Sequence, residues 1–285
     1  MTRSSCKINI ITGILVILLL VIPSTVGAHD ATANLQNEET LLKSLYDKNK
    51  QAVVMIRVAI DPAKIKTGEN RQENKNKEQF KKFIFPILKE KLVVDESGQT
   101  QSFQIGTGFI ITPDGEILTN YHVIDAYKEI YVFLANGPVF KADVLGFDKA
   151  SDIALLKIQT AIQITFPTLT MGDSNSLTEA KPIFVIGHPF ALSWTRSSGT
   201  VNEPRRLIPV NTQPLIQIQA PINPGNSGSP LITTLDNKVV GIIQSIPDDA
   251  NGGSTGIAFA IPINFAKTIL PFLRNQKNKK NNAEK

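Results

Sequence analysis

Ser227 lies in the stretch PINPGNSGSP, residues 221–230, where three prolines and two glycines surround a small hydroxyl. Glycine reaches backbone conformations that other residues avoid, so Gly225 and Gly228 allow the chain to turn tightly about this serine. A serine becomes a useful nucleophile once a neighbouring base takes its proton. The stretch therefore indicates either a plain surface turn or a backbone shaped around a reactive serine.

The base that activates a serine is usually a histidine, because the histidine pKa lies near neutrality. The chain has only three histidines: His29, His122 and His188. His29 lies where we expect the mature chain to begin, and chain ends are mobile. His188 sits in a turn between glycine and proline, which is typical of a structural or exposed histidine. His122 directly follows a short strand and has apolar neighbours that can hold its ring. Such a setting by itself is more typical of a structural histidine, so the expectation that His122 is the base depends on its partners.

A catalytic histidine needs an acceptor for its second ring nitrogen, which sets the tautomer and stabilises the imidazolium. Asp152 is the candidate, since it begins the apolar strand in KASDIALLKI. One interpretation is an aspartate that merely caps this strand at the edge of a loop. A carboxylate at the edge of a core needs a partner, however, because burying an unpaired charge is costly. We therefore expect Asp152 to pair with His122.

The glycines around Ser227 also predict a site for a negative charge. A tight turn can direct the backbone N–H groups of Gly225 and Ser227 towards one point. Acyl transfer needs such a pair, because the tetrahedral intermediate carries an oxyanion. Gly225 and Ser227 are therefore the expected oxyanion hole.

Chain order separates this triad from other serine hydrolases. An α/β-hydrolase has the order Ser, Asp, His, but no histidine follows Ser227. The subtilisin order Asp, His, Ser would require His188 as the base. The order His122, Asp152, Ser227 instead matches that of chymotrypsin-type enzymes.

The elements that must hold these residues are short strands separated by Gly, Pro, Asn and Asp. Six are expected over residues 52–160 and six more over residues 161–270, and no core-quality helix lies between them. This pattern favours an all-β fold of two six-stranded antiparallel β-barrels. A short C-terminal helix is expected over residues 265–275, bent or ended near Pro271.

The remaining segments are polar or basic. Residues 29–51 read as a polar helical lead-in, residues 62–100 as a long charged loop and residues 271–285 as a basic tail. The 285-residue chain is 42% hydrophobic with a formal net charge of +5, an ordinary globular composition. No aromatic residues interleave with the charges of the basic tail, so we expect no nucleic-acid partner.

Residues 1–28 contain a basic start, an apolar run and a small-residue ending, which is the order of a secretory signal peptide cleaved after Ala28. The alternative is an uncleaved membrane anchor, since the apolar run is about long enough to span a bilayer. Both interpretations export the globular part, to the periplasm or outside the cell. The single cysteine, Cys6, lies in this segment, so the fold has no disulfide framework to rely on.

Six blocks of the sequence resemble, in order, the signature blocks of the HtrA/Deg group of trypsin-like serine proteases. The blocks are GTGFIITPDGEILTNYHVI, ASDIALLKI, MGDSNSL, VIGHPFAL, PINPGNSGSPL and TGIAFAIPI. The resemblance implies His122 as general base, Asp152 as its orienting acid and Ser227 as nucleophile, in a cleft between two barrels. It also implies polypeptide substrates and no metal or cofactor. The family's association into trimers is allowed by the resemblance.

The resemblance has departures that concern the substrate. Only some twenty residues follow AIPI, which leaves no room for the PDZ domain that the family usually appends. The GNSGSP form also resembles glutamyl endopeptidases of the same fold. In this fold the residue six before the nucleophile, Pro221, lies at the base of the specificity pocket. Pro221, Ile222 and Gln244 carry no charge, so we expect cleavage after small or medium apolar residues.

Two other functions fit the same residues. A chaperone or binding protein could keep the fold without turnover. An esterase could use the same triad on a different acyl group.

Overall fold

The computed structural model describes residue 36 and residues 39–60, 103–125, 127–208, 213–245 and 256–283. The N-terminal segment 1–28 and the charged loop 62–100 lie outside these residues. Residues 39–49 are helical, and the compact unit that carries both barrels begins at Tyr46. Within the described ranges, no helix has both the length and the apolar character needed to cross a membrane.

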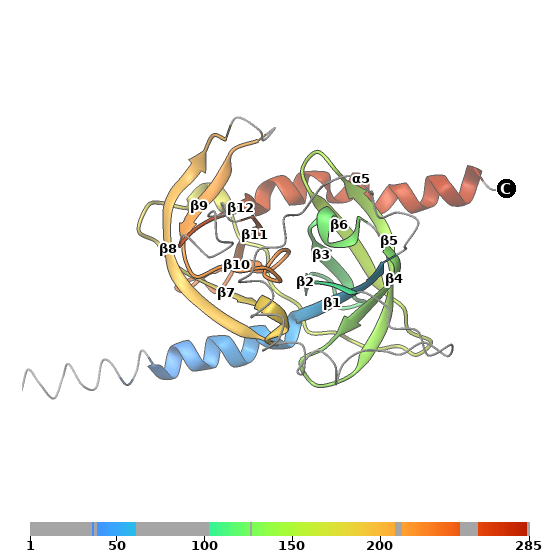
Figure 1. Ribbon diagram of the computed structural model, residues 1–285, viewed down its shortest axis with the longest axis horizontal. Helices are drawn as coiled ribbons and strands as arrows, with labels where there is room; N and C mark the ends of the chain where they lie inside the picture. Colours follow the sequence, from blue (N-terminus) through green and yellow to red (C-terminus); the bar gives the residue numbers. More distant parts are fainter. Residues whose placement is uncertain are drawn as a thin grey trace, which may run out of the picture. The chain divides into compact units, whose positions relative to one another are not determined.

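Twelve strands form within the described ranges, and every strand expected from the sequence is among them (Figure 1). The first six are β1 (Val53–Ile60), β2 (Phe103–Ile110), β3 (Glu116–Thr119), β4 (Tyr127–Phe133), β5 (Val139–Asp148) and β6 (Ile153–Ile158). The second six are β7 (Pro182–Gly187), β8 (Thr195–Arg206), β9 (Leu215–Gln219), β10 (Pro230–Thr233), β11 (Val239–Ser245) and β12 (Ile257–Pro262). The helices are η2 (Lys50–Ala52), α4 (Tyr121–Ile124), η4 (Ser174–Ser176), η5 (Pro189–Ala191) and α5 (Ile263–Ala283).

The strands close into two antiparallel barrels built on one plan. The first has the order β1-β2-β3-β6-β5-β4, and the second, starting from β7, has the order β7-β8-β9-β12-β11-β10. Closure removes exposed sheet edges, which all-β proteins must otherwise protect. The expected fold class, two six-stranded barrels with a C-terminal helix, is therefore confirmed.

Each barrel encloses its own apolar core. In the first barrel, Val54, Ile56 and Val58 of β1 point inward with other buried residues of the barrel, following the two-residue period of a strand. In the second barrel, Ile183 and Val185 of β7 pack in the core together with buried residues from the other five strands.

Strand β1 is buried on both of its faces. Val53 and Met55, on the face opposite the first barrel's core, are at most 2% exposed, and β1 contacts β7 of the second barrel. This explains why the stretch AVVMIRVAI is nearly continuously apolar rather than alternating. The contact joins the two barrels that must share the site.

Helix α5 contacts strands of both barrels, including β5 and β11. Its buried residues Ile263, Ala266, Leu270 and Leu273 recur at helical spacing, which gives the helix one apolar stripe.

The C-terminal helix does not end near Pro271, because α5 continues through this proline to Ala283 and includes most of the basic tail. A proline inside a helix costs about 3 kcal/mol, so contacts beyond it must compensate. Gln276 exchanges two hydrogen bonds of 2.9 Å with the backbone of Phe147 in β5. Arg274 donates three hydrogen bonds to the carboxylate of Glu116, the shortest being 2.6 Å. These contacts with the first barrel hold the helix past the proline, and they involve partners more than a hundred residues away in the sequence.

Candidate functional site

His122 lies in α4, a single turn that follows β3, and it is held by both oxygens of one carboxylate. Its ring Nδ1 is 2.8 Å from Asp152 Oδ2, and its backbone N–H donates to Asp152 Oδ1 over 2.8 Å. An ionised carboxylate can only accept hydrogen bonds, so Nδ1 carries the ring proton and Nε2 keeps its lone pair. The carboxylate is 14% exposed and the imidazole 43% exposed. The pair thus presents a basic nitrogen on a fixed ring whose partner is shielded from water.

The backbone of Asp152 is as closely held as its side chain. Its φ of 58° lies in the left-handed region, which aspartate tolerates better than most residues. Its carbonyl accepts hydrogen bonds from Asn120 Nδ2, at 3.0 Å, and from the Tyr121 N–H, at 3.1 Å. Asp152 therefore does more than cap β6: it joins the start of that strand to the turn that carries His122.

Ser227 lies in the turn between β9 and β10, and the two glycines of this turn are required by the backbone. Gly225 has a φ of 102° and Gly228 a φ of 84°. A Cβ on Gly225 would come 2.3 Å from the carbonyl oxygen of His188, and one on Gly228 would come 2.0 Å from that of Thr107. Any side chain at either position would therefore force neighbouring backbone to move.

The N–H groups of this turn divide into two sets. Those of Asn226, Gly228 and Ser229 donate to backbone carbonyls over 2.9–3.0 Å. Those of Gly225 and Ser227 donate to no acceptor in the part of the chain that the structure describes. The two amides expected to bind an oxyanion are therefore the two that the fold leaves available.

The side chain of Ser227 points to its own barrel in this structure. Its hydroxyl donates to the Gln244 carbonyl over 3.4 Å, and within the described ranges no hydrogen bond joins it to His122. The serine backbone is nevertheless attached to the first barrel, since the Ser227 carbonyl accepts from the Thr107 N–H over 2.8 Å. The structure thus brings His122 and Asp152 into contact and docks the Ser227 turn on the barrel that carries them.

The three residues expected in a specificity pocket occupy different environments. Pro221 is exposed, whereas Ile222 is 2% exposed and packs within the core of the second barrel. Gln244 is partly buried and contacts Ser227 through its backbone carbonyl. Among these three residues, Gln244 alone forms a hydrogen bond with Ser227.

His188, which sequence reasoning placed in a turn, is fully buried next to the serine turn. Its Nδ1 is 3.1 Å from Thr107 Oγ1, and its ring lies edge-on to Trp194 with ring centroids 5.0 Å apart. The environment is that of a structural histidine, the role that the sequence indicated as one of two alternatives.

Thr107 was not identified from the sequence, although it contacts both His188 and the serine turn. A signal was present, because Thr107 is a polar residue placed between two glycines on an expected strand. The side chain of Thr107 is 0% exposed.

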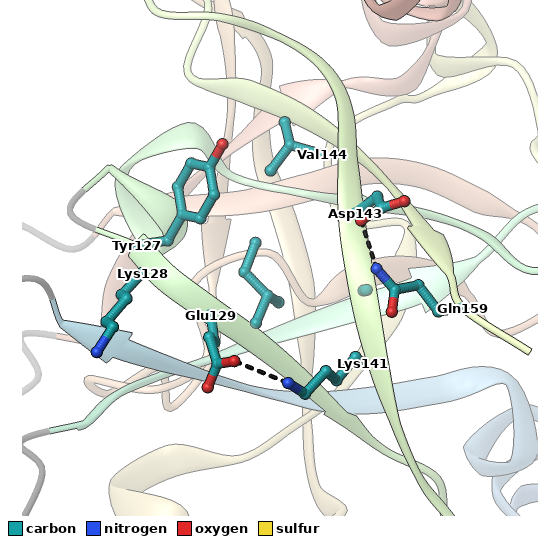
Figure 2. Close-up of a pocket in the computed structure, with 9 residues that line it drawn as sticks. Tyr127, Lys128, Glu129, Lys141, Asp143, Val144 and Gln159 are labelled. Atoms are coloured by element: carbon teal, nitrogen blue, oxygen red, sulfur yellow. Dashed lines mark hydrogen bonds and ion pairs between the residues drawn. The ribbon is translucent and has the colours of Figure 1, made fainter.

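The hollow drawn in Figure 2 lies on β4 and β5 of the first barrel, with a volume of about 520 Å³, and no member of the triad lines it. Two pairs of its polar side chains bind each other: Lys141 pairs with Glu129 over 2.7 Å, and Gln159 donates to Asp143 over 2.5 Å. Hydrogen bonds lower the pKa of Glu129; the one from Lys141 has the largest effect, and the one from Tyr131 the next largest. These four paired side chains are therefore engaged with one another rather than prepared for catalysis.

Comparison with known proteins agrees with this geometry. A family model described as a trypsin-like peptidase domain matches residues 106–242, which include all three triad candidates. A probable periplasmic serine endoprotease, DegP-like, from Halomonas elongata is 42% identical over 172 residues, covering 60% of this chain and 35% of that protein. A protein of the same description from Rickettsia conorii is 33% identical and covers 92% of this chain and 55% of its own length. The chain thus spans between about a third and just over half of the length of these curated relatives.

Solved structures show the same fold. The HtrA-type protease AlgW with a decapeptide has a TM-score of 0.62 and 25% sequence identity, over 82% of this chain and 67% of that one. The same protease with a tripeptide has a TM-score of 0.62 over 81% of this chain and 62% of that one. By sequence and by fold, this chain belongs to the HtrA/Deg group of trypsin-like serine proteases.

Proposed function

We propose that this protein is an exported serine endopeptidase that hydrolyses unfolded or misfolded polypeptides through Ser227, His122 and Asp152. The main support for the proposal is that the Asp152 carboxylate accepts hydrogen bonds from both the backbone N–H and the ring Nδ1–H of His122. With the ring proton on Nδ1, Nε2 is free to act as the base. The relatives described as periplasmic serine endoproteases support the same activity and the same exported location.

In the first half of the reaction, Ser227 Oγ attacks the peptide carbonyl carbon while His122 Nε2 takes the hydroxyl proton. Asp152 stabilises the imidazolium that results. The carbonyl oxygen becomes an oxyanion, which the N–H groups of Gly225 and Ser227 bind. His122 then returns the proton to the leaving amine, and the C–N bond breaks to give an acyl-enzyme.

In the second half, water replaces the amine. His122 takes a proton from the water as it attacks the acyl carbon, and the same two amides bind the second oxyanion. Collapse of this intermediate returns the proton to Ser227 Oγ and releases the new carboxyl end. No step needs a metal or a cofactor, since the residues of the chain supply the base, the nucleophile and the oxyanion donors.

The hydrogen bond from Ser227 to Gln244 describes a resting position of the nucleophile. At 3.4 Å it is longer than a typical O–H···O bond, so it opposes rotation of the serine side chain only weakly. Catalytic hydrogen bonds are often long or misaligned without substrate and shorten in the bound complex. We expect Ser227 to rotate towards His122 when a peptide binds.

A fluorophosphonate probe tests this function directly. The wild-type protein should be labelled on Ser227, as identified by mass spectrometry of the labelled peptide, and should degrade unfolded casein. Absence of labelling at every pH and temperature would favour a binding protein that has no turnover. Hydrolysis of esters with intact casein would favour an esterase. The mass of the labelled protein, purified from cells that export it, also shows whether the N-terminal segment is removed. A chain that starts near His29 indicates a cleaved signal peptide, and the full-length mass indicates an anchor.

We also propose that the peptide bond cut follows a small or medium apolar residue such as Val, Ala, Ile or Leu. Pro221, Ile222 and Gln244 offer no charge to a substrate side chain, and an ammonium or carboxylate buried without a partner costs several kcal/mol. Each methylene in such a pocket is worth only about 1–3 kcal/mol, so the preference should be broad. The measurement is a mass-spectrometric map of all cuts in a denatured protein mixture, with Ser227→Ala as the background. A dominant cut after Lys, Arg or Glu would contradict this pocket while leaving the triad in place.

A further inference from the structure

The two peptide groups that flank Gly225 are each held by a residue outside the serine turn. The Phe190 N–H, in η5, donates to the carbonyl of Pro224 over 2.8 Å. The hydroxyl of Thr107, in β2 of the first barrel, donates to the carbonyl of Gly225 over 2.7 Å. The residue whose N–H should bind the oxyanion is therefore anchored on both sides, from two different barrels.

These anchors determine where the amides point. The peptide bonds are trans, so the carbonyl and the N–H of one peptide group point in opposite directions. With the Pro224 carbonyl turned towards Phe190, the Gly225 N–H must point away from Phe190. With the Gly225 carbonyl held by Thr107, the peptide group between Gly225 and Asn226 cannot rotate without breaking this 2.7 Å hydrogen bond. The backbone of Gly225 has the conformational freedom of glycine, so its orientation depends on such contacts rather than on its own sterics.

Thr107 is itself held firmly enough to act as an anchor. It is 0% exposed, its carbonyl accepts the Thr119 hydroxyl over 2.7 Å, and its N–H donates to the Ser227 carbonyl over 2.8 Å. A hydroxyl has one proton, and Thr107 gives it to Gly225. His188 Nδ1, 3.1 Å from the same oxygen, must therefore be the donor in their contact. A donor at Nδ1 reinforces the direction of the threonine proton, since it occupies the acceptor side of the oxygen.

We infer that Thr107 is a positioning residue for the oxyanion hole: its hydroxyl holds the Gly225 carbonyl so that the amides of the serine turn stay directed at the developing negative charge. The inference rests on the proposed serine protease function. On this inference the first barrel has two roles in catalysis. It supplies the base, and it orients the oxyanion-binding N–H groups of the second barrel. Thr107 touches neither the substrate nor the reacting atoms, and acts only through Gly225.

The test compares Thr107→Val, which removes the hydroxyl at similar volume, with Thr107→Ser, which keeps it. We expect Thr107→Val to lower kcat by about 10-fold to 100-fold, below the effect of deleting an oxyanion donor, with KM within about twofold of the wild type. Thr107→Ser should keep most of the wild-type kcat. The rate constants come from a peptide substrate taken from the map of cuts, and thermal unfolding of each variant reports its stability.

Thr233→Val is the matched control. Thr233 is also 0% exposed, and its hydroxyl also donates to a backbone carbonyl, that of Lys238. It lies at the end of β10 that is farther along the chain from Ser227. This variant should leave kcat unchanged. If Thr107→Val does not fold, Thr107→Ala removes the same hydroxyl without adding a methyl group, and the same loss of kcat is expected.

A folded Thr107→Val with the kcat of the wild type would overturn the inference and leave the serine protease function standing. An equal loss of kcat in Thr107→Ser, or in Thr233→Val, would also overturn it, because the effect would not follow the hydroxyl at this position. A wild-type protein that neither reacts with the fluorophosphonate nor cuts casein would overturn the proposed function together with the inference.

Discussion

Ser227→Ala should lower kcat by about a million-fold and abolish fluorophosphonate labelling, and His122→Ala should lower kcat by a similar factor. The reason is that the nucleophile and its base act as one unit, so the loss of either removes the whole acyl-transfer route. The double variant should therefore be no slower than either single variant. The rates come from casein digestion and from a peptide substrate, with purified variants whose thermal unfolding matches that of the wild type.

Ser176→Ala is the control for the serine change, because Ser176 is an exposed residue in η4 whose hydroxyl contacts only local backbone. It should keep wild-type activity and labelling. Full activity in His122→Ala would contradict the assignment of the base, and His188 would then be the next histidine to test. Strictly additive losses in the double variant would show that the two residues do not act together.

Asp152→Asn should lower kcat by roughly 10,000-fold while leaving the fold intact. Oδ1 of Asp152 accepts the backbone N–H of His122, and Oδ2 accepts its ring Nδ1–H. An asparagine has only one acceptor oxygen, and the backbone N–H requires it. The amide NH₂ then faces Nδ1, which must become an acceptor, and the ring proton moves to Nε2. A histidine in that tautomer cannot take the proton of Ser227.

The folded structure should survive this change. The left-handed backbone at position 152 suits asparagine as well as aspartate, and the hydrogen bonds from Asn120 and Tyr121 go to the backbone carbonyl, which is unchanged. The control is Asp114→Asn, which removes an exposed carboxylate paired with Lys157 on the barrel surface. It should leave kcat as it is. Wild-type activity in a folded Asp152→Asn would show that another group orients His122.

Local patterns in the sequence predict the strands and the three candidate catalytic residues. Short apolar segments with a two-residue period, separated by turn residues, specify strands through local rules, and all twelve were predictable. Three local features point to these residues. Histidines are scarce, which points to His122; Asp152 is an acid at the start of an apolar strand; and Ser227 lies in a glycine-rich turn. These signals are local, since each depends on residue types within about ten positions.

The contacts between distant residues that hold the site in shape become visible only in the folded chain. Thr107 meets Gly225 across 118 positions and His188 across 81, so no local pattern could pair them. The extension of α5 past Pro271 likewise depends on contacts with Phe147 and Glu116 of the first barrel. Such contacts follow from how the closed barrels pack against each other, and strand periodicity does not encode that packing. For this reason the three candidate catalytic residues could be predicted from the sequence, while Thr107, which holds the turn of Ser227 from the other barrel, could not.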